Sequence, residues 1–168
     1  DSFQNDSEDI ERRITSNTKA IMPVHIGGLP GDLERIMAIA KKYNLLVIED
    51  SCQCALSEYQ GKKLGNFGDL GCVSFQSSKT IPCGEGGAII GNNEELMDKC
   101  YTVQNHGTNR QRRTETIGPK YRMNDFEAAV LLVQLPVVYE QFLRRNENAD
   151  YLTSRLKDVP GVVPQKRY

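Results

Sequence analysis

A single lysine that follows a buried strand is the residue of this sequence best placed for covalent chemistry. The apolar run from Gly71 to Phe75 predicts a short strand, and Lys79 comes after the hydroxyl-rich turn that follows it. Ligands of open α/β sheets bind at the carboxyl edge of the strands. A lysine that loses solvation there can be a neutral amine, which forms a Schiff base with a carbonyl compound. Most lysines are solvated surface charges, so this position alone does not establish the role.

Two other predicted strands end in residues that can do chemistry. Residues 20–24 are predicted to form a strand that ends at His25. The continuous apolar run 45–48 is typical of a strand buried on both faces, and Asp50 follows it. A right-handed crossover between the two strands makes them parallel, so His25 and Asp50 are expected at the same sheet edge as Lys79. A loop histidine bonded to backbone remains the alternative for His25.

Helices are predicted from their capping residues. Asp32 can begin an amphipathic helix between the first two strands, and Asn44 can end it. Asn93 can begin another helix after the predicted strand 88–90. Asn124 and Glu127 have the spacing of a capping box, which marks the start of a third helix. The alternation of strands and helices predicts an α/β fold.

Two segments in the second half of the chain are predicted to meet another surface. Residues 108–120 are polar and unpatterned, and they are longer than a routine connection, so they form either a mobile loop or an arm ordered by a partner. The helix predicted over 126–135 is apolar nearly all round, which is typical of burial between layers or subunits. Pro136 should kink or break it, and a last amphipathic helix is predicted over 149–156.

Composition excludes several classes of protein. The 168 residues are 39% hydrophobic, which is enough for one core. The 21 basic and 22 acidic residues leave no field that recruits nucleic acid or an anionic membrane. The five cysteines are an odd number without metal-site spacing, so we expect reduced thiols, no bound metal and a cytoplasmic protein. Because the chain opens on Asp1 rather than methionine, we expect a piece of a longer protein.

Several motifs, in order along nearly the whole chain, resemble the DegT/DnrJ/StrS family of sugar aminotransferases. They are VIEDSCQ (47–53), GDLGCVSFQSSK (68–79), GEGGAI (84–89), NHG (105–107) and YRMNDFEAAVLLVQL (121–135). The resemblance implies a fragment of the type I aminotransferase large domain, with a mostly parallel central sheet flanked by helices. It assigns residues 1–122 to a partial PLP-binding large domain and 123–168 to a helical segment that leads into a truncated small domain. Because family members are longer, the fragment by itself is expected to be inactive.

The resemblance also implies roles for individual residues. Lys79 would hold the cofactor, pyridoxal 5'-phosphate (PLP), covalently and then carry the proton between carbons as general base and acid. Asp50 would face the pyridine nitrogen and keep it protonated, so both residues are expected to be catalytic. Gln53 would donate near the phenolic oxygen of the ring, and Ser74 would contact the phosphate. Taken alone, Asp50 can also be a helix cap and Ser74 a buried hydroxyl bonded to backbone.

The chain departs from the family pattern at two places. The family usually has an asparagine that reaches the PLP phosphate of the neighbouring subunit, and Lys120 stands there. A lysine can still meet a phosphate as a point charge, so we expect a homodimer with shared sites, the alternative being a solvated loop lysine. After Gln53 the family often continues Ala-His-Gly, where this chain has Cys54, Ala55 and Leu56, which puts the local substrate side in doubt.

The resemblance implies transfer of an amino group from an amino acid, glutamate or glutamine, to a nucleotide-linked keto-sugar or a keto-cyclitol. A PLP-dependent sugar dehydratase is one alternative, but that variant has histidine in place of the lysine, so Lys79 argues against it. The other alternative is a truncated, non-catalytic protein that binds a phosphorylated ligand or a partner.

Overall fold

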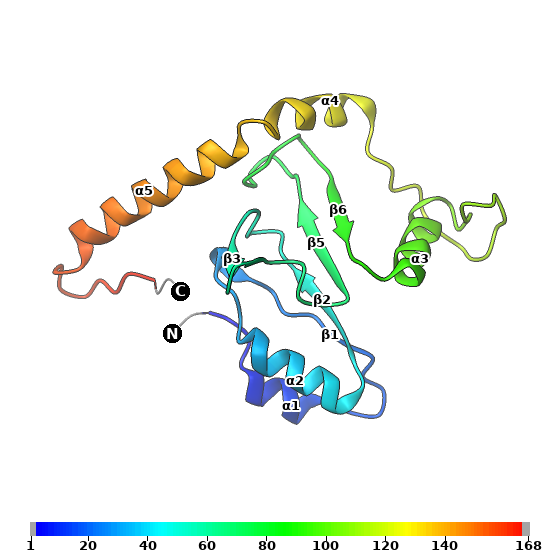
Figure 1. Cartoon of the computed structure of the whole chain (residues 1–168), viewed down its shortest axis with the longest axis horizontal. Coiled ribbons are helices and arrows are strands. Elements are labelled where there is room, and N and C mark those ends of the chain that lie inside the picture. The colour runs from blue at the N-terminus through cyan, green and yellow to red at the C-terminus, as the bar shows by residue number, and fades with distance from the viewer. Residues whose placement is uncertain (1–2, 166–168) are drawn as a thin grey trace.

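A four-stranded sheet forms the centre of the molecule, for which the computed structural model describes residues 3–165 (Figure 1). Its strands, in spatial order, are β1 (Ala20–Ile21), β2 (Leu46–Asp50), β5 (Leu70–Ser74) and β6 (Gly87–Ile90). The first three run parallel, whereas β6 pairs antiparallel with β5. The prediction of a mostly parallel sheet is therefore confirmed, with β1 and β6 as its open edges.

The helices begin and end close to the predicted capping residues. They are α1 (Ser7–Arg13), α2 (Leu33–Tyr43), α3 (Glu94–Gln104), α4 (Asp125–Gln134) and α5 (Val138–Leu156), with a short 3-10 turn, η1 (Ile26–Gly28). The side chain of Asp32 accepts the N–H of Arg35, and Asn44 closes α2 in the left-handed conformation. Asn124 and Glu127 form the expected capping box.

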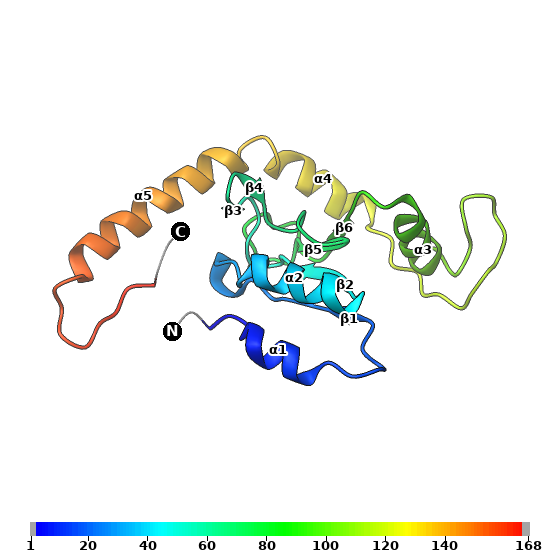
Figure 2. The same cartoon turned by 60° about the horizontal axis from the view of Figure 1, so that its bottom comes forward.

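One face of the sheet carries the core. Helices α1 and α2 lie together on that face, as Figure 2 shows. The cluster beneath them consists of buried apolar residues: Ile21, Ile36, Ile39, Ala40 and Val47. Burying such side chains is the main stabilising term of the fold.

The prediction that the strand of residues 45–48 is buried on both faces is wrong within this chain. Val47 and Glu49 are buried, but Leu46 is 40% exposed and Ile48 only partly buried. On β6, Ile89 is 46% exposed. The reason is that α1 and α2 cover only one face of the sheet. The apolar run has the composition of a strand buried on both faces, but within residues 3–165 the second face has no helix packed on it.

A small hairpin of β3 (Glu58–Tyr59) and β4 (Lys62–Lys63) was not predicted from the sequence. The strands are joined at Gly61, whose φ of +75° suits a residue without a Cβ. A second buried cluster lies below the hairpin, formed by Leu33, Cys54 and Leu64. The hairpin thus packs the loops that follow β2 against the start of α2.

Helices α4 and α5 run along the upper side of the molecule, over the carboxyl ends of β2 and β5 (Figure 1). They are bent by 59° at the break that contains Pro136, as predicted. The last helix is longer than the predicted 149–156, and its first half carries apolar residues at helical spacing, Val138 and Phe142, that the prediction missed. Within residues 3–165, no single helix is long and apolar enough to cross a membrane, although the bent pair meets that test by length and composition. The domain division between residues 122 and 123 stays a prediction.

We predict that Gly71→Ala destabilises the protein far more than Gly31→Ala, although both glycines are buried. A Cβ at Gly71 would overlap the carbonyl oxygen of Gly65, whereas at Gly31 it would meet Ile36 at an ordinary 3.6 Å. Overpacking of this kind costs about 1–3 kcal/mol. The measurement is the free energy of unfolding in urea, and equal losses in the two variants would contradict the close approach of β5 to the loop at Gly65.

Candidate active site at the strand ends

Three strand ends meet at one edge of the sheet, as predicted. Val24 pairs with Asp50 in an isolated parallel bridge, and Asp50 pairs with Cys72 in β5. The N–H of His25 donates to the carbonyl oxygen of Asp50 at 3.1 Å. The polar residues that follow these strands are therefore neighbours, although they lie far apart in the sequence.

Asp50 ends β2 with its side chain held by its own loop. One carboxylate oxygen, Oδ1, accepts the N–H of Cys52 at 3.1 Å, and the side chain is partly buried. No helix begins at Asp50, so the helix-cap alternative is wrong, and the carboxylate instead closes a short turn. This turn presents the carboxylate at the carboxyl edge of the sheet.

The pKa of the Cys52 thiol is affected by both Asp50 and Lys79. Burial, followed by the adjacent carboxylate of Asp50, raises the pKa of the Cys52 thiol to about 12. The ammonium group of Lys79 acts on the same thiol in the opposite direction and lowers its pKa. Asp50 and Lys79 thus both act electrostatically on one sulfur atom. This brings together the two residues predicted to be catalytic.

Lys79 lies in a turn that begins where β5 ends. Its N–H donates to the carbonyl oxygen of Gln76 at 2.9 Å, and Gln76 forms a bridge with Gly84 that closes the loop. Gly84 and Gly86 have φ values of +107° and +139°, which explains the glycines of this loop. Within residues 3–165, the Lys79 side chain forms no ion pair with a carboxylate, and it is half-buried.

Gln53 and Ser74 lie on the loops beside this pair. The Oε1 atom of Gln53 accepts the N–H of Gly27 at 2.9 Å, so its amide nitrogen remains as a donor. The hydroxyl of Ser74 accepts the N–H of Gln76 at 3.3 Å, as the backbone-bonded alternative expects, and its hydrogen remains to donate. Both side chains can therefore still donate to a ligand.

Lys120 is not part of this group. It is exposed and pairs with Asn105 in an antiparallel bridge, so it lies at the base of a closed loop rather than on an extended arm. The N–H of His106 donates to the carbonyl oxygen of Pro119 at 3.0 Å and closes the same base. Figure 1 shows this loop beside α3, beyond the β6 edge of the sheet.

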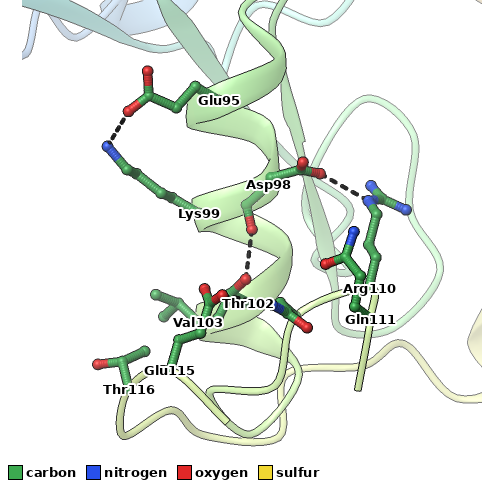
Figure 3. Close-up of a pocket in the computed structure, with 10 residues that line it drawn as sticks. Glu95, Asp98, Lys99, Thr102, Val103, Arg110, Gln111, Glu115 and Thr116 are labelled. Atoms are coloured by element: carbon green, nitrogen blue, oxygen red, sulfur yellow. Dashed lines mark hydrogen bonds and ion pairs between the residues drawn. The ribbon is translucent and has the colours of Figure 1, made fainter. Parts of the chain in front are cut away.

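The loop of residues 106–119 folds back on α3 and borders an open pocket of about 450 Å³ (Figure 3). Arg110 fixes it, because its Nε donates to Asp98 at 2.8 Å and its guanidinium lies 4.4 Å from the centre of the Tyr101 ring. The prediction for residues 108–120 is a mobile loop or an arm ordered by a partner, and the structure instead shows a loop folded on its own helix. Four of the charged groups in Figure 3 form two ion pairs, Lys99 with Glu95 and Arg110 with Asp98.

A larger cavity of about 560 Å³ lies between the strand-end loops and α5. Gln53 and Thr80, the residue after Lys79, line it from the sheet, and Phe142 and Arg145 line it from α5. Arg145 donates to the carbonyl oxygen of Thr80 at 3.4 Å. Helix α5 is therefore tied to the loop that carries Lys79.

A buried pair that the sequence did not reveal lies directly behind the site. The side chains of His25 and Glu49 are fully buried, with Nε2 and Oε2 3.0 Å apart. Burial would raise the pKa of Glu49, but the hydrogen bonds from His25 and three backbone N–H groups outweigh it, and the pKa lies below its ordinary value. The only feature of the sequence that could have indicated this pair is a histidine and a glutamate at the ends of neighbouring strands.

The groups at the strand ends fit a cofactor such as PLP. They offer an amine for a carbonyl, a carboxylate for a protonated ring nitrogen, and amide and hydroxyl donors for oxygen substituents. Within residues 3–165, no cluster of three or more His, Cys, Asp or Glu side chains could hold a metal ion.

Comparison with known proteins agrees with this arrangement. Residues 1–167 match the model of the DegT/DnrJ/EryC1/StrS aminotransferase family. GDP-perosamine synthase of Escherichia coli O157:H7 is 42% identical over 99% of this chain and 46% of its own length. A dTDP-3-amino-3,6-dideoxy-alpha-D-galactopyranose transaminase of Aneurinibacillus thermoaerophilus is 38% identical over 95% of this chain and 45% of its own length. The chain thus spans about half the length of these relatives.

A solved structure extends the agreement to the fold. The structure of 3-amino-5-hydroxybenzoic acid synthase superposes with a TM-score of 0.92 at 30% identity, over 99% of this chain and 45% of the other. The α/β arrangement described above is therefore that of sugar aminotransferase relatives.

We predict that the reactivity of Cys52 changes in opposite directions when its two charged neighbours are removed. Because the thiolate is the reactive form, Asp50→Asn should speed alkylation by iodoacetamide and Lys79→Met should slow it. Peptide mass spectrometry measures the rates at alkaline pH. Cys100 is the internal control, because burial alone raises its pKa. Unchanged Cys52 rates in both variants would show that the two charges do not act on the thiol.

Proposed function

Because the chain belongs to the DegT/DnrJ/EryC1/StrS aminotransferase family, we propose that the protein carrying it is a PLP-dependent sugar aminotransferase that uses the strand-end site. The observation that carries this proposal is the meeting of two strand ends: Asp50 ends β2, which pairs in parallel with β5, and Lys79 lies in the turn that follows β5. A carboxylate and a lysine at adjoining strand ends are the two groups that transamination needs from the protein.

Each residue has a distinct task. When bound, PLP supplies a carbonyl for the amino group and a ring that accepts electrons. Asp50 holds a proton at the ring nitrogen. Its turn with Cys52 places the Asp50 carboxylate at the sheet edge. The Nζ atom of Lys79 binds the cofactor and afterwards moves the proton as general base and acid. Gln53 and Ser74 donate to the cofactor's oxygen atoms and so orient it.

The acceptor is proposed to be a keto-sugar linked to a nucleotide, or a keto-cyclitol, with glutamate or glutamine as donor. The names of the relatives support this choice, since one is a synthase of a GDP-linked amino sugar and another a transaminase of a dTDP-linked amino sugar. The cavity between the strand-end loops and α5 has room for a group beside Lys79, because Thr80 lines it. We further propose that the reaction takes place in the cytoplasm.

The working unit is proposed to be a homodimer with shared sites. Helix α4 supports this, because within residues 3–165 it has no buried residue, and Phe126 and Val133 are 87% and 74% exposed. Lys120 lies on the closed loop beside α3, away from the site of its own chain. An exposed lysine there is available to the phosphate of a partner's cofactor.

Lys79 is predicted to be the residue that binds PLP covalently. In a purified full-length protein that carries this sequence, borohydride treatment with PLP should fix the label on the Lys79 peptide, found by peptide mapping. The Lys79→Ala variant is the matched control and should take up no label at the strand-end site. Specific labelling at another lysine, or none, would refute the proposed function.

Mixed dimers test the shared site. Lys120→Ala should weaken PLP binding by about ten- to a hundredfold, because a charge-assisted contact to phosphate contributes about 1.5–3 kcal/mol. When Lys79→Ala and Lys120→Ala chains are combined, a shared site puts both defects in one site and leaves the other intact. PLP titration of the mixed dimer should then recover the natural Kd. A recovered site with the Kd of Lys120→Ala would show that the lysine serves its own subunit.

A further inference from the structure

The buried pair of His25 and Glu49 has no role in the proposed chemistry, and its connections lead to the residues that do. The N–H of Gly31 donates to Nδ1 of His25 at 3.4 Å, so the ring carries its proton on Nε2. That proton is donated to Oε2 of Glu49 at 3.0 Å. The histidine is thus held between a backbone N–H on one side and a carboxylate on the other.

Glu49 satisfies its buried charge entirely with hydrogen bonds. Its Oε2 also accepts the N–H of Gly65 at 2.9 Å, and its Oε1 accepts those of Phe67 and Gly68 at 2.5 and 2.7 Å. A buried carboxylate without such partners would be very costly, so the four donors and the carboxylate depend on one another. The side chain therefore joins β2 to two loops, residues 25–31 and 65–68.

The first of these loops also touches the candidate site. The N–H of His25 donates to the carbonyl oxygen of Asp50 at 3.1 Å, and two residues later Gly27 donates to the side chain of Gln53 at 2.9 Å. Two of the residues predicted to contact PLP are thus bonded to the backbone that the buried pair holds. Because successive side chains of a strand project to opposite faces, Glu49 itself is directed away from the face that Asp50 presents.

We propose that Glu49, acting through His25, is a positioning residue that fixes Asp50 and Gln53 where they meet the cofactor. The inference rests on the proposed function, since it concerns how PLP is held. Without the carboxylate, His25 loses its acceptor and three backbone N–H groups lose theirs, so the 25–31 loop and the end of β2 can move apart. Asp50 then no longer has one place relative to the ring nitrogen.

Asp69, which lies just before β5, provides a matched control because it bonds to the same strand, β2. Its Oδ2 accepts the N–H of Val47 at 2.8 Å, so it too is a carboxylate bonded to backbone, but near the amino end of β2. Asp69→Asn and Glu49→Gln are each expected to lower the unfolding temperature. If Glu49 acted on stability alone, the two variants would bind PLP equally well.

The experiment compares these variants in the purified full-length protein, using PLP as the probe. Glu49→Gln should raise the Kd for PLP by about ten- to a hundredfold, which is the effect seen at metal sites when a residue that hydrogen-bonds to a metal ligand is replaced. Asp69→Asn should leave the Kd for PLP unchanged. The NMR shift of a ¹⁵N-labelled pyridine nitrogen should move toward the unprotonated value in Glu49→Gln only. In an Asp50→Asn background, Glu49→Gln should change that shift little further.

Two results would overturn the proposal. One is a Glu49→Gln variant whose Kd and nitrogen shift match those of Asp69→Asn. If Glu49→Gln does not fold, His25→Gln is measured instead, and a natural Kd and shift in that variant would also overturn it. The unsubstituted protein separates a failure of this proposal from a failure of the proposed function. If PLP binds at Lys79 in the unsubstituted protein, the proposed function stands even when the Glu49 proposal fails.

Discussion

The parallel pairing of β2 between β1 and β5 is the constraint on which the rest of the structure depends. Its register aligns Val24, Asp50 and Cys72, so the carboxyl ends of the strands lie at the same edge of the sheet. Every candidate site residue except Lys120 follows from that alignment, because each lies at or just beyond a strand end. A register slip of one residue would exchange the faces of Glu49 and Asp50 and so bury the wrong carboxylate.

The two adjacent carboxylates of β2 illustrate how environment divides similar groups between roles. Glu49 is fully buried and accepts four hydrogen bonds, so it acts as a structural charge that cannot reach a ligand. Asp50 is only partly buried and engages a single backbone N–H, beside a lysine without a carboxylate partner within residues 3–165. Asp50 is therefore the carboxylate available for chemistry, and the fixed position of Glu49 supports it.

Apolar surface is left uncovered in two places, on the second face of the sheet and on α4. Leu46 and Ile89 are exposed on the former, and Phe126 and Val133 on the latter. Contiguous exposed apolar surface usually marks a contact with another surface. The described residues cover neither of these two faces.

The sequence by itself determined the elements whose signals are local. The caps Asp32, Asn44 and Asn124 define helix ends through bonds within a few residues, and Pro136 breaks a helix for lack of an N–H. The parallel pairing of β1 with β2 followed from strand–helix–strand alternation and handedness. The motif around Lys79 indicated the family. Each of these features depends on chemistry between near neighbours or on a rule of chain connection.

Tertiary structure alone decided what depends on partners far apart in the sequence. The pairing of His25 with Glu49 joins residues 24 positions apart, and the Cys52 thiol is affected both by Asp50, at the end of β2, and by Lys79, in the turn after β5. The closed base at Lys120 replaced an expected arm, because backbone hydrogen bonds to Asn105 and His106 leave no mark on composition. Burial of only one sheet face was equally unpredictable, since an apolar run records which surfaces can be covered, not which are covered within the chain.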